Sequence, residues 1–457
     1  MYENIEIPET IDEYISKGIK KGKKKKNSFK VKRMSGTIVG LALLLLITCI
    51  RVSPVFASNV AKIPGLKYIV ELVRFDKGLS SAIDNNYIQN IDKSCEKLGI
   101  IFTVKDIIAD TSGIIVFYSI ENKGNYKWPN IREAKLLDSN GKQLEMSSSL
   151  SYTPSDDKIY KGKIDFYVVN ENGENFQMPD NIVLQTKIAV NKAVSTENND
   201  KPSNTNTLEA PFDDSEVLKG IWEVAIPIDK SKFSELEKVY KIDQSVEVEG
   251  QKILFEDIKI YPTKSILSVS FDKANSKKIF SLENLKLVDE KGQEWGRINN
   301  GMTGSFPGEN SQTLNFQSNY FYKPKELYIT GNSIRALEKG NCYITVDVEK
   351  RKITYSPYNF ISISEFSLAD NKLSFQAEIQ KDLEDIYNGF QISNEATDAN
   401  GNKLDNTCTG MVTDEKKIYN NYTLKLNDNF KGPITFKIYD YPSKIKGAFK
   451  VKIPLDR

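Results

Sequence analysis

Histidine is absent from all 457 residues of this chain. Its absence excludes catalytic triads that use an imidazole base, and it excludes zinc sites that mix His with Cys ligands. The sequence also lacks a nucleophile elbow, a phosphate-binding loop and a dinucleotide-binding glycine motif. None of the 61 acidic residues stands out as part of the carboxylate pair that glycoside cleavage requires. We therefore predict a non-enzymatic protein without a cofactor or a metal.

Cysteine is scarce, and no two cysteines have the CxxC spacing of a redox or zinc motif. The four residues are Cys49, Cys95, Cys342 and Cys408. Cys49 falls in an apolar stretch, which leaves three thiols in the remainder of the chain. In an oxidising compartment one bridge, between Cys342 and Cys408, is compatible with this number. Isolated buried thiols are the alternative.

Charge is one-sided only near the N-terminus, although the whole chain carries a net charge of just +2. Ten lysines and arginines lie between Lys17 and Arg33 with no acid among them, and the apolar residues 34–50 follow directly. Such a cationic flank stays in the cytoplasm while the apolar segment enters the bilayer. We predict one membrane-spanning helix over residues 34–57, with a cytoplasmic N-terminus and an extracellular C-terminus. The residues expected to set this topology are Lys23, Lys24, Lys25, Lys26, Lys32 and Arg33.

A cleaved signal peptide is the alternative interpretation of the same region. Val55-Phe56-Ala57 has the small residues of a cleavage site. Both interpretations place the rest of the chain outside the membrane. The basic flank is expected to attract anionic lipid headgroups, and because membrane topology already accounts for it, we predict no nucleic-acid partner.

The predicted cytoplasmic tail has an apolar stripe with helical spacing, formed by Ile7, Ile11, Ile15 and Ile19. Pro8 suits a first helical turn, and lysines follow at the C-terminal end, as the helix dipole favours. A helix this short does not bury its stripe alone. The stripe therefore lies either on the inner leaflet or against a cytoplasmic partner.

Beyond the membrane segment, short helical patterns near Ile69–Val73 and from Leu79 to Ile91 give way to β-strand patterns from Gly99 onward. Three hairpins share one plan: residues 100–104 with 114–118, residues 253–260 with 266–271, and residues 366–368 with 373–377. A strand that ends in an Asp-x-x-Gly turn follows each, at 138–141, 289–292 and 398–401. We assign these aspartates to turn chemistry rather than calcium, because no EF-hand ligand spacing follows them.

This repetition predicts a mainly β fold of tandem β-sandwiches, preceded by a short cytoplasmic helix, one transmembrane helix and short juxtamembrane helices. The polar residues 193–216 are expected to be a loop of the first sandwich, which residues 221–226 complete. The predicted regions are 1–33 (cytoplasmic), 34–57 (transmembrane), 58–95 (juxtamembrane helices), and three sandwiches at 96–232, 233–352 and 353–457.

The N-terminal quarter resembles a known family through a series of motifs. These are Ile7-Pro8-Glu9, the short apolar span, Ser53-Pro54-Val55-Phe56-Ala57, Ile63-Pro64-Gly65 and Val73-Arg74-Phe75-Asp76-Lys77-Gly78. The series is similar to Gram-positive membrane proteins that carry the domain of unknown function 4179, over roughly residues 1 to 125. The strand-rich remainder resembles the domain of unknown function 5643.

The resemblance implies a single-pass protein that restrains an extracytoplasmic-function sigma factor. This chain departs from well-understood anti-sigma factors, because its tail has only 33 residues and lacks the His and Cys ligands of the zinc-containing type. Sigma-factor binding would therefore rest on the Ile7–Ile19 stripe. We predict an envelope sensor or regulator that contacts membrane lipid, a cytoplasmic sigma factor, and a cell-wall or extracellular ligand. The alternative is a wall-associated or ligand-binding surface protein without a role in transcription.

Overall fold

The computed structural model describes most of the chain from Ile69 onward. The described residues are 69, 72–73, 75–124, 126–153, 159–168, 176–191, 215–233, 237–298, 303–357, 361–369, 371–380, 390–413, 416–426 and 430–455. The predicted cytoplasmic tail and the predicted membrane span, including every lysine, arginine and isoleucine proposed above as a functional residue, lie outside them. Within these residues no helix combines the length and the hydropathy that a bilayer crossing requires.

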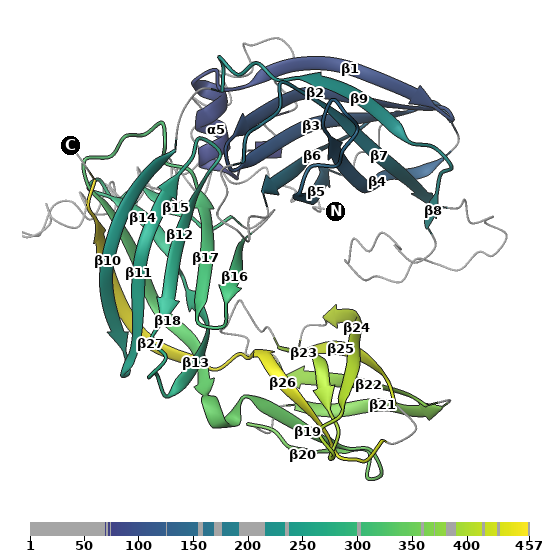
Figure 1. The fold of residues 1–457 in the computed structure, drawn as a ribbon, viewed down its shortest axis with the longest axis vertical. Helices are drawn as coiled ribbons and strands as arrows, with labels where there is room; N and C mark the ends of the chain where they lie inside the picture. The colour runs from purple at the N-terminus through teal and green to yellow at the C-terminus, as the bar shows by residue number, and fades with distance from the viewer. Residues whose placement is uncertain are drawn as a thin grey trace, which may run out of the picture. The chain divides into compact units, whose positions relative to one another are not determined.

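The described part is mainly β, with antiparallel sheets and one short α-helix, as predicted in this coarse form (Figure 1). The first region comprises α5 (Lys77–Asp84), β1 (Gln89–Lys97), β2 (Ile100–Asp110), β3 (Gly113–Asn122), β4 (Lys127–Leu137), β5 (Met146–Thr153), β6 (Ile159–Val168), β7 (Asn181–Asn191), β8 (Ser215–Val217) and β9 (Trp222–Pro227). Its two sheets have the orders β1-β2-β3-β6-β5 and β4-β7-β8, with β9 also paired to β7. Side chains from both sheets meet in one hydrophobic core that includes Phe102, Trp222 and Ile226.

The second region follows the same plan. It comprises β10 (Lys238–Val248), β11 (Gln251–Ile260), β12 (Lys264–Phe271), β13 (Lys277–Glu283), β14 (Lys286–Asp289), β15 (Glu294–Gly296), β16 (Gly304–Gly308), β17 (Ser311–Gln317) and β18 (Leu327–Glu338). The sheet orders are β10-β11-β12-β17-β16 and β13-β18-β14-β15. The C-terminal strand β27 (Lys444–Ile453) joins the second of these sheets by pairing with β18. Phe255, Trp295 and Phe449 lie in the shared core.

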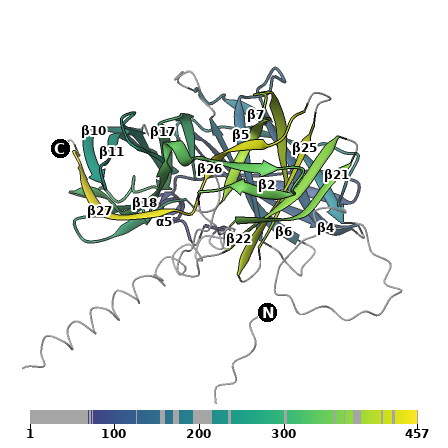
Figure 2. The same ribbon diagram turned by 90° about the horizontal axis from the view of Figure 1, so that it is seen from below.

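The third region is one eight-stranded sheet with the order β20-β19-β26-β23-β24-β25-β22-β21. After the short 3₁₀-helix η3 (Lys339–Asn341), its strands are β19 (Tyr343–Asp347), β20 (Lys352–Tyr355), β21 (Ile361–Ala369), β22 (Lys372–Gln380), β23 (Gln391–Thr397), β24 (Lys403–Thr413), β25 (Lys417–Lys425) and β26 (Ile434–Asp440). Figures 1 and 2 show the consecutive strands β26 and β27, both yellow, in different sheets.

The three predicted hairpins are confirmed as the antiparallel pairs β2–β3, β11–β12 and β21–β22. The Asp-x-x-Gly turns are confirmed as well. In each of them the aspartate Oδ1 accepts hydrogen bonds from the backbone N–H groups two and four residues later, at 2.7–2.9 Å. Gly141, Gly292 and Gly401 have φ of 77–82°, which a glycine adopts without strain. One carboxylate oxygen of each aspartate is thus occupied by two backbone hydrogen bonds within its own turn.

Strand pairing shows which strands belong together in each of the three regions. The domain boundaries stay predictions. β9 completes the first region's second sheet, as expected for residues 221–226. In contrast, β19 begins before residue 353 and pairs with β26, while β27 lies after it and pairs with β18. The helix expected from Leu79 to Ile91 ends at Asp84, and Ile91 belongs to β1, where its side chain packs against the first core.

Candidate functional site at helix α5

Helix α5 is an amphipathic segment with a defined start. Asp76 is its N-cap, and its Oδ1 accepts a hydrogen bond from Leu79 N–H at 3.0 Å. This satisfies one of the backbone donors that every helix leaves free at its first turn. Leu79, Ala82 and Ile83 are at most 2% exposed. Because eight residues are too few for a stable isolated helix, packing on neighbouring strands must hold α5 in place.

The Asp76-Lys77-Gly78 sequence attaches α5 to the second region. Lys77 Nζ donates to Glu294 O at 2.7 Å, and Gln317 Nε2 donates to Phe75 O at 2.9 Å. A Cβ on Gly78 would lie 2.3 Å from Ser318 N, so only glycine permits this approach of the helix to the end of β17. The motif that carries the family resemblance is therefore a docking motif between distant parts of the chain.

Two hairpin turns meet beside α5. The turn after β2 places Asp110, which is 5% exposed, against the turn between β11 and β12. Its Oδ2 accepts hydrogen bonds from Thr263 N at 2.9 Å and Thr263 Oγ1 at 2.6 Å. Its Oδ1 accepts from Ser112 N at 2.9 Å and Ser112 Oγ at 2.6 Å. The carboxylate thus has four donors, two from each turn, and it joins the first two regions.

A small cavity of about 40 Å³ adjoins these turns and the start of α5. Its lining combines apolar groups with the polar residues Asp76, Ser112, Lys163, Asp165, Tyr167, Thr263 and Lys264. Lys163 pairs with Asp165 Oδ2, while Asp165 Oδ1 has no hydrogen-bond partner among the described residues. The space suits ordered water, which would satisfy that oxygen, and it is far below the several hundred Å³ of a metabolite pocket.

Two charged groups at this cavity have displaced pKa values. Burial raises the pKa of Asp76 to about 6, against the lowering effect of the Leu79 N–H bond and of Lys163. Burial also lowers the pKa of Lys264, although Asp110 and Asp165 oppose this. In both residues desolvation disfavours the charged form. We call the set Asp76, Gly78, Asp110, Thr263 and Lys264 the α5 junction.

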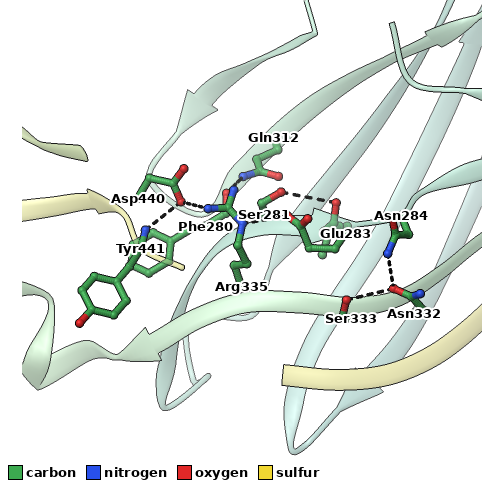
Figure 3. Close-up of polar contacts among 11 residues, drawn as sticks. Phe280, Ser281, Glu283, Asn284, Gln312, Asn332, Ser333, Arg335, Asp440 and Tyr441 are labelled. Carbon is green, nitrogen blue, oxygen red and sulfur yellow. Dashed lines mark hydrogen bonds and ion pairs between the residues drawn. The ribbon is translucent and has the colours of Figure 1, made fainter. Parts of the chain in front are cut away.

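A second cluster joins the second and third regions around Arg335, on β18. Figure 3 shows the guanidinium between Glu283 and Asp440, which come from β13 and β26. Arg335 Nε lies 2.8 Å from Glu283 Oε1, and Arg335 Nη1 pairs with Asp440 Oδ1. The three side chains are 5%, 16% and 15% exposed. Asp440 Oδ1 also accepts from Tyr441 N–H at 2.8 Å. We call this set the Arg335 junction.

The free thiols of the described residues lie outside any metal-binding cluster. Cys95 and Cys342 are both free, so the Cys342–Cys408 bridge is absent. Burial raises the pKa of Cys342, which makes it a poor nucleophile. In the described ranges no three Cys, Asp or Glu side chains are close enough to hold a metal ion.

Sequence reasoning missed both junctions. It predicted the hairpins that contain these two turns, but not that the turns touch, because their contact spans more than 150 residues. One signal was available. Residues 114–118 form an unbroken apolar run, which indicates a strand buried on both faces. The second face requires a cover, and α5 is an apolar segment that lies before this strand in the chain.

Comparison with known proteins identifies two parts of the chain. Residues 23–122 match the domain of unknown function DUF4179, and residues 237–360 match the family of unknown function DUF5643. Both domains are present, and the α5 junction joins them. A crystal structure of a conserved domain protein from Bacillus anthracis is similar at 20% identity and a TM-score of 0.40, over 62% of this chain and 90% of that one. No curated protein matches this chain.

Proposed function

We propose that this chain is a single-pass, membrane-anchored extracytoplasmic sensor or regulator. The cationic flank up to Arg33 and the apolar residues 34–57 support a cytoplasmic tail and an external β region. In this proposal the sheet pairs are tandem β-sandwich modules. The tail contacts anionic lipid through its lysines and a sigma factor through Ile7, Ile11, Ile15 and Ile19.

The α5 junction is the observation that carries the sensory role. Helix α5 begins only about twenty residues after the predicted span, and contacts from both the DUF4179 and the DUF5643 domains hold it. A wall or extracellular ligand that changes how these two domains meet would therefore move the segment that enters the membrane. The small volume of the junction cavity favours a macromolecular ligand over a metabolite.

The first experiment tests the cytoplasmic partner. Full-length protein in detergent micelles is mixed with the sigma factors of its own cell, and bound proteins are recovered. Capture of one sigma factor, lost when Ile11 and Ile15 are both replaced by Lys, would support the proposal. Capture of no sigma factor by the unsubstituted protein would refute the transcriptional version.

A wall-associated surface protein without a role in transcription is the second candidate. The absence of histidine favours it, because the chain then lacks the His ligands of the zinc-containing anti-sigma factors. Deletion of residues 1–22 distinguishes the two, since residues 23–33 keep a basic flank for membrane insertion. Unchanged transcription after this deletion, with the protein still at the surface, would favour the second candidate.

A further inference from the structure

Strand β5 is an edge strand that lacks every feature that normally prevents strand pairing. An exposed edge presents free N–H and C=O groups to any neighbouring strand, and proteins protect it with charges, prolines, bulges or short length. The sequence of β5 is Met-Ser-Ser-Ser-Leu-Ser-Tyr-Thr, without a charge, a proline or a glycine. It pairs with β6 in eight successive positions with no register shift, and among the described residues β5 has no second partner strand (Figure 1).

The other edges of the described sheets are all protected. β1, β10 and β21 each have a register shift together with charged residues in the strand. β4, β9 and β16 contain prolines, β13 and β27 contain lysines, and β8, β15 and β20 have at most four residues, one of them charged. The edge of β5 differs from all of these edge strands because it has no protecting feature. This difference points to a partner strand.

The chain leading into β5 limits where a partner can bind. Leu144 N–H donates to Leu136 O of β4, so the preceding residues are already paired. Met146 N–H donates to Leu144 O at 2.8 Å, so the free donors of the edge begin after Met146. Met146 and Leu150 pack against the first core from one face, which fixes β5 in position. Ser148 and Tyr152 are exposed, and Tyr152 is 42% exposed.

We propose that β5 pairs antiparallel with β5 of a second copy of this chain, which makes one continuous sheet across a two-fold axis. Two copies of a strand without charges do not repel each other. Such a strand also has no charge that could select a strand of a different protein by complementarity. Residues that face each other must lie on the same face of the sheet. The two-fold axis therefore lies midway between the two copies of Ser149 or between the two copies of Leu150. With either axis, seven residues of one copy face seven residues of the other.

Thiol cross-linking of the full-length protein in its own membranes tests this pairing. Ser149→Cys places a thiol within two positions of its copy for either axis, which a short bis-maleimide can span. The control is Ser362→Cys on the protected edge strand β21, where the side chain is more exposed than that of Ser149. The unsubstituted chain gives the background from its four native cysteines. We expect at least about fivefold more cross-linked dimer from Ser149→Cys than from Ser362→Cys.

A second substitution distinguishes strand pairing from chance proximity. Ser148→Lys adds the charge that other edges carry, and in the Ser149→Cys background it should reduce the dimer to the Ser362→Cys level. Far-ultraviolet circular dichroism checks that this variant keeps its strands. Equal cross-linking from both thiol positions, or a dimer that Ser148→Lys leaves unchanged, would overturn the proposal. A cross-link from the thiol introduced by Ser149→Cys to a different protein would overturn it too, by assigning the edge to a foreign strand.

Discussion

The two junctions join successive β regions by different physical means. At the Arg335 junction, one buried cation lies between two carboxylates from different sheets, so each charge has a partner. At the α5 junction, hydrogen bonds to Asp110 and the close approach of Gly78 provide the attachment, and displaced pKa values and a small cavity accompany them. A site with fully paired charges is suited to hold two parts together, whereas one with displaced pKa values and empty space is suited to respond to a change.

Arg335→Ala should have the largest effect of any single substitution at either junction. It removes the cation that lies between the largely buried carboxylates of Glu283 and Asp440, and breaking a buried ion pair in this way typically costs about 3–5 kcal/mol of unfolding free energy. Urea denaturation of the chain measures the loss. Lys452→Ala is the control, because it removes an exposed ion pair with Glu326. A similar loss from both variants would contradict the importance of the buried pairs.

Asp110→Ala should cost somewhat less, about 2–3 kcal/mol, because it leaves the buried Thr263 N–H without its acceptor. The same denaturation experiment measures it. Thr263→Val removes only the Oγ1–H donor and keeps the backbone bond, so its effect should be about half as large. An Asp110→Ala variant as stable as the unsubstituted protein would show that the two turns do not hold each other.

Gly78→Ala should destabilise the protein by about 1–3 kcal/mol, since the added methyl group overlaps Ser318 N. The expected sign is informative, because alanine normally favours a helix over glycine. Gly340→Ala is the matched control, as nothing lies within 4 Å of a Cβ there. Thermal melting of both variants gives the comparison. A stabilised Gly78→Ala variant would show that α5 does not contact β17 so closely.

Asp76 should make the pH dependence of the unfolding free energy differ between the two junctions by about 1 kcal/mol. The expected difference is no larger because solvent partly screens this half-buried carboxyl. The folded state raises the pKa of this carboxyl from 3.8 to about 6, so folding favours its protonated form. The contribution of Asp76 is therefore full below about pH 4 and is lost as pH rises through about 6.

Asp76→Asn removes that dependence while keeping a good N-cap residue. Melting temperatures measured between about pH 4 and about pH 8 should converge for the two proteins at the acid end, and the variant should be more stable at the alkaline end. Parallel curves over this range would exclude Asp76 as the titrating group.

The surface control, Lys452→Ala, should have the smallest effect of the set. Lys452 and Glu326 are 56% and 43% exposed, so water screens their attraction. High salt should abolish what remains, whereas it should leave the Arg335 junction almost unchanged. Salt-dependent denaturation of both variants checks this contrast.

Local features of this fold were predictable from the sequence, and its long-range contacts were not. Alternation and turn residues predicted the hairpins and the Asp-x-x-Gly turns, because these depend on neighbours a few residues apart. The return of β27 to β18 depends on more than a hundred intervening residues, and nothing local in Lys444–Ile453 specifies it. Gly78 lies in a motif that carries the family resemblance, but the sequence does not show why glycine is required there. The structure shows it, because a Cβ at this position would overlap Ser318 N.

The central claim is that the α5 junction, rather than the Arg335 junction, holds helix α5 in place. Hydrogen exchange at the amides of Leu79 to Ile83 tests it most directly in the full-length protein. The account predicts that Asp110→Ala accelerates exchange of these amides at least about tenfold, while Arg335→Ala leaves them protected. Acceleration by both variants alike, or by neither, would contradict it.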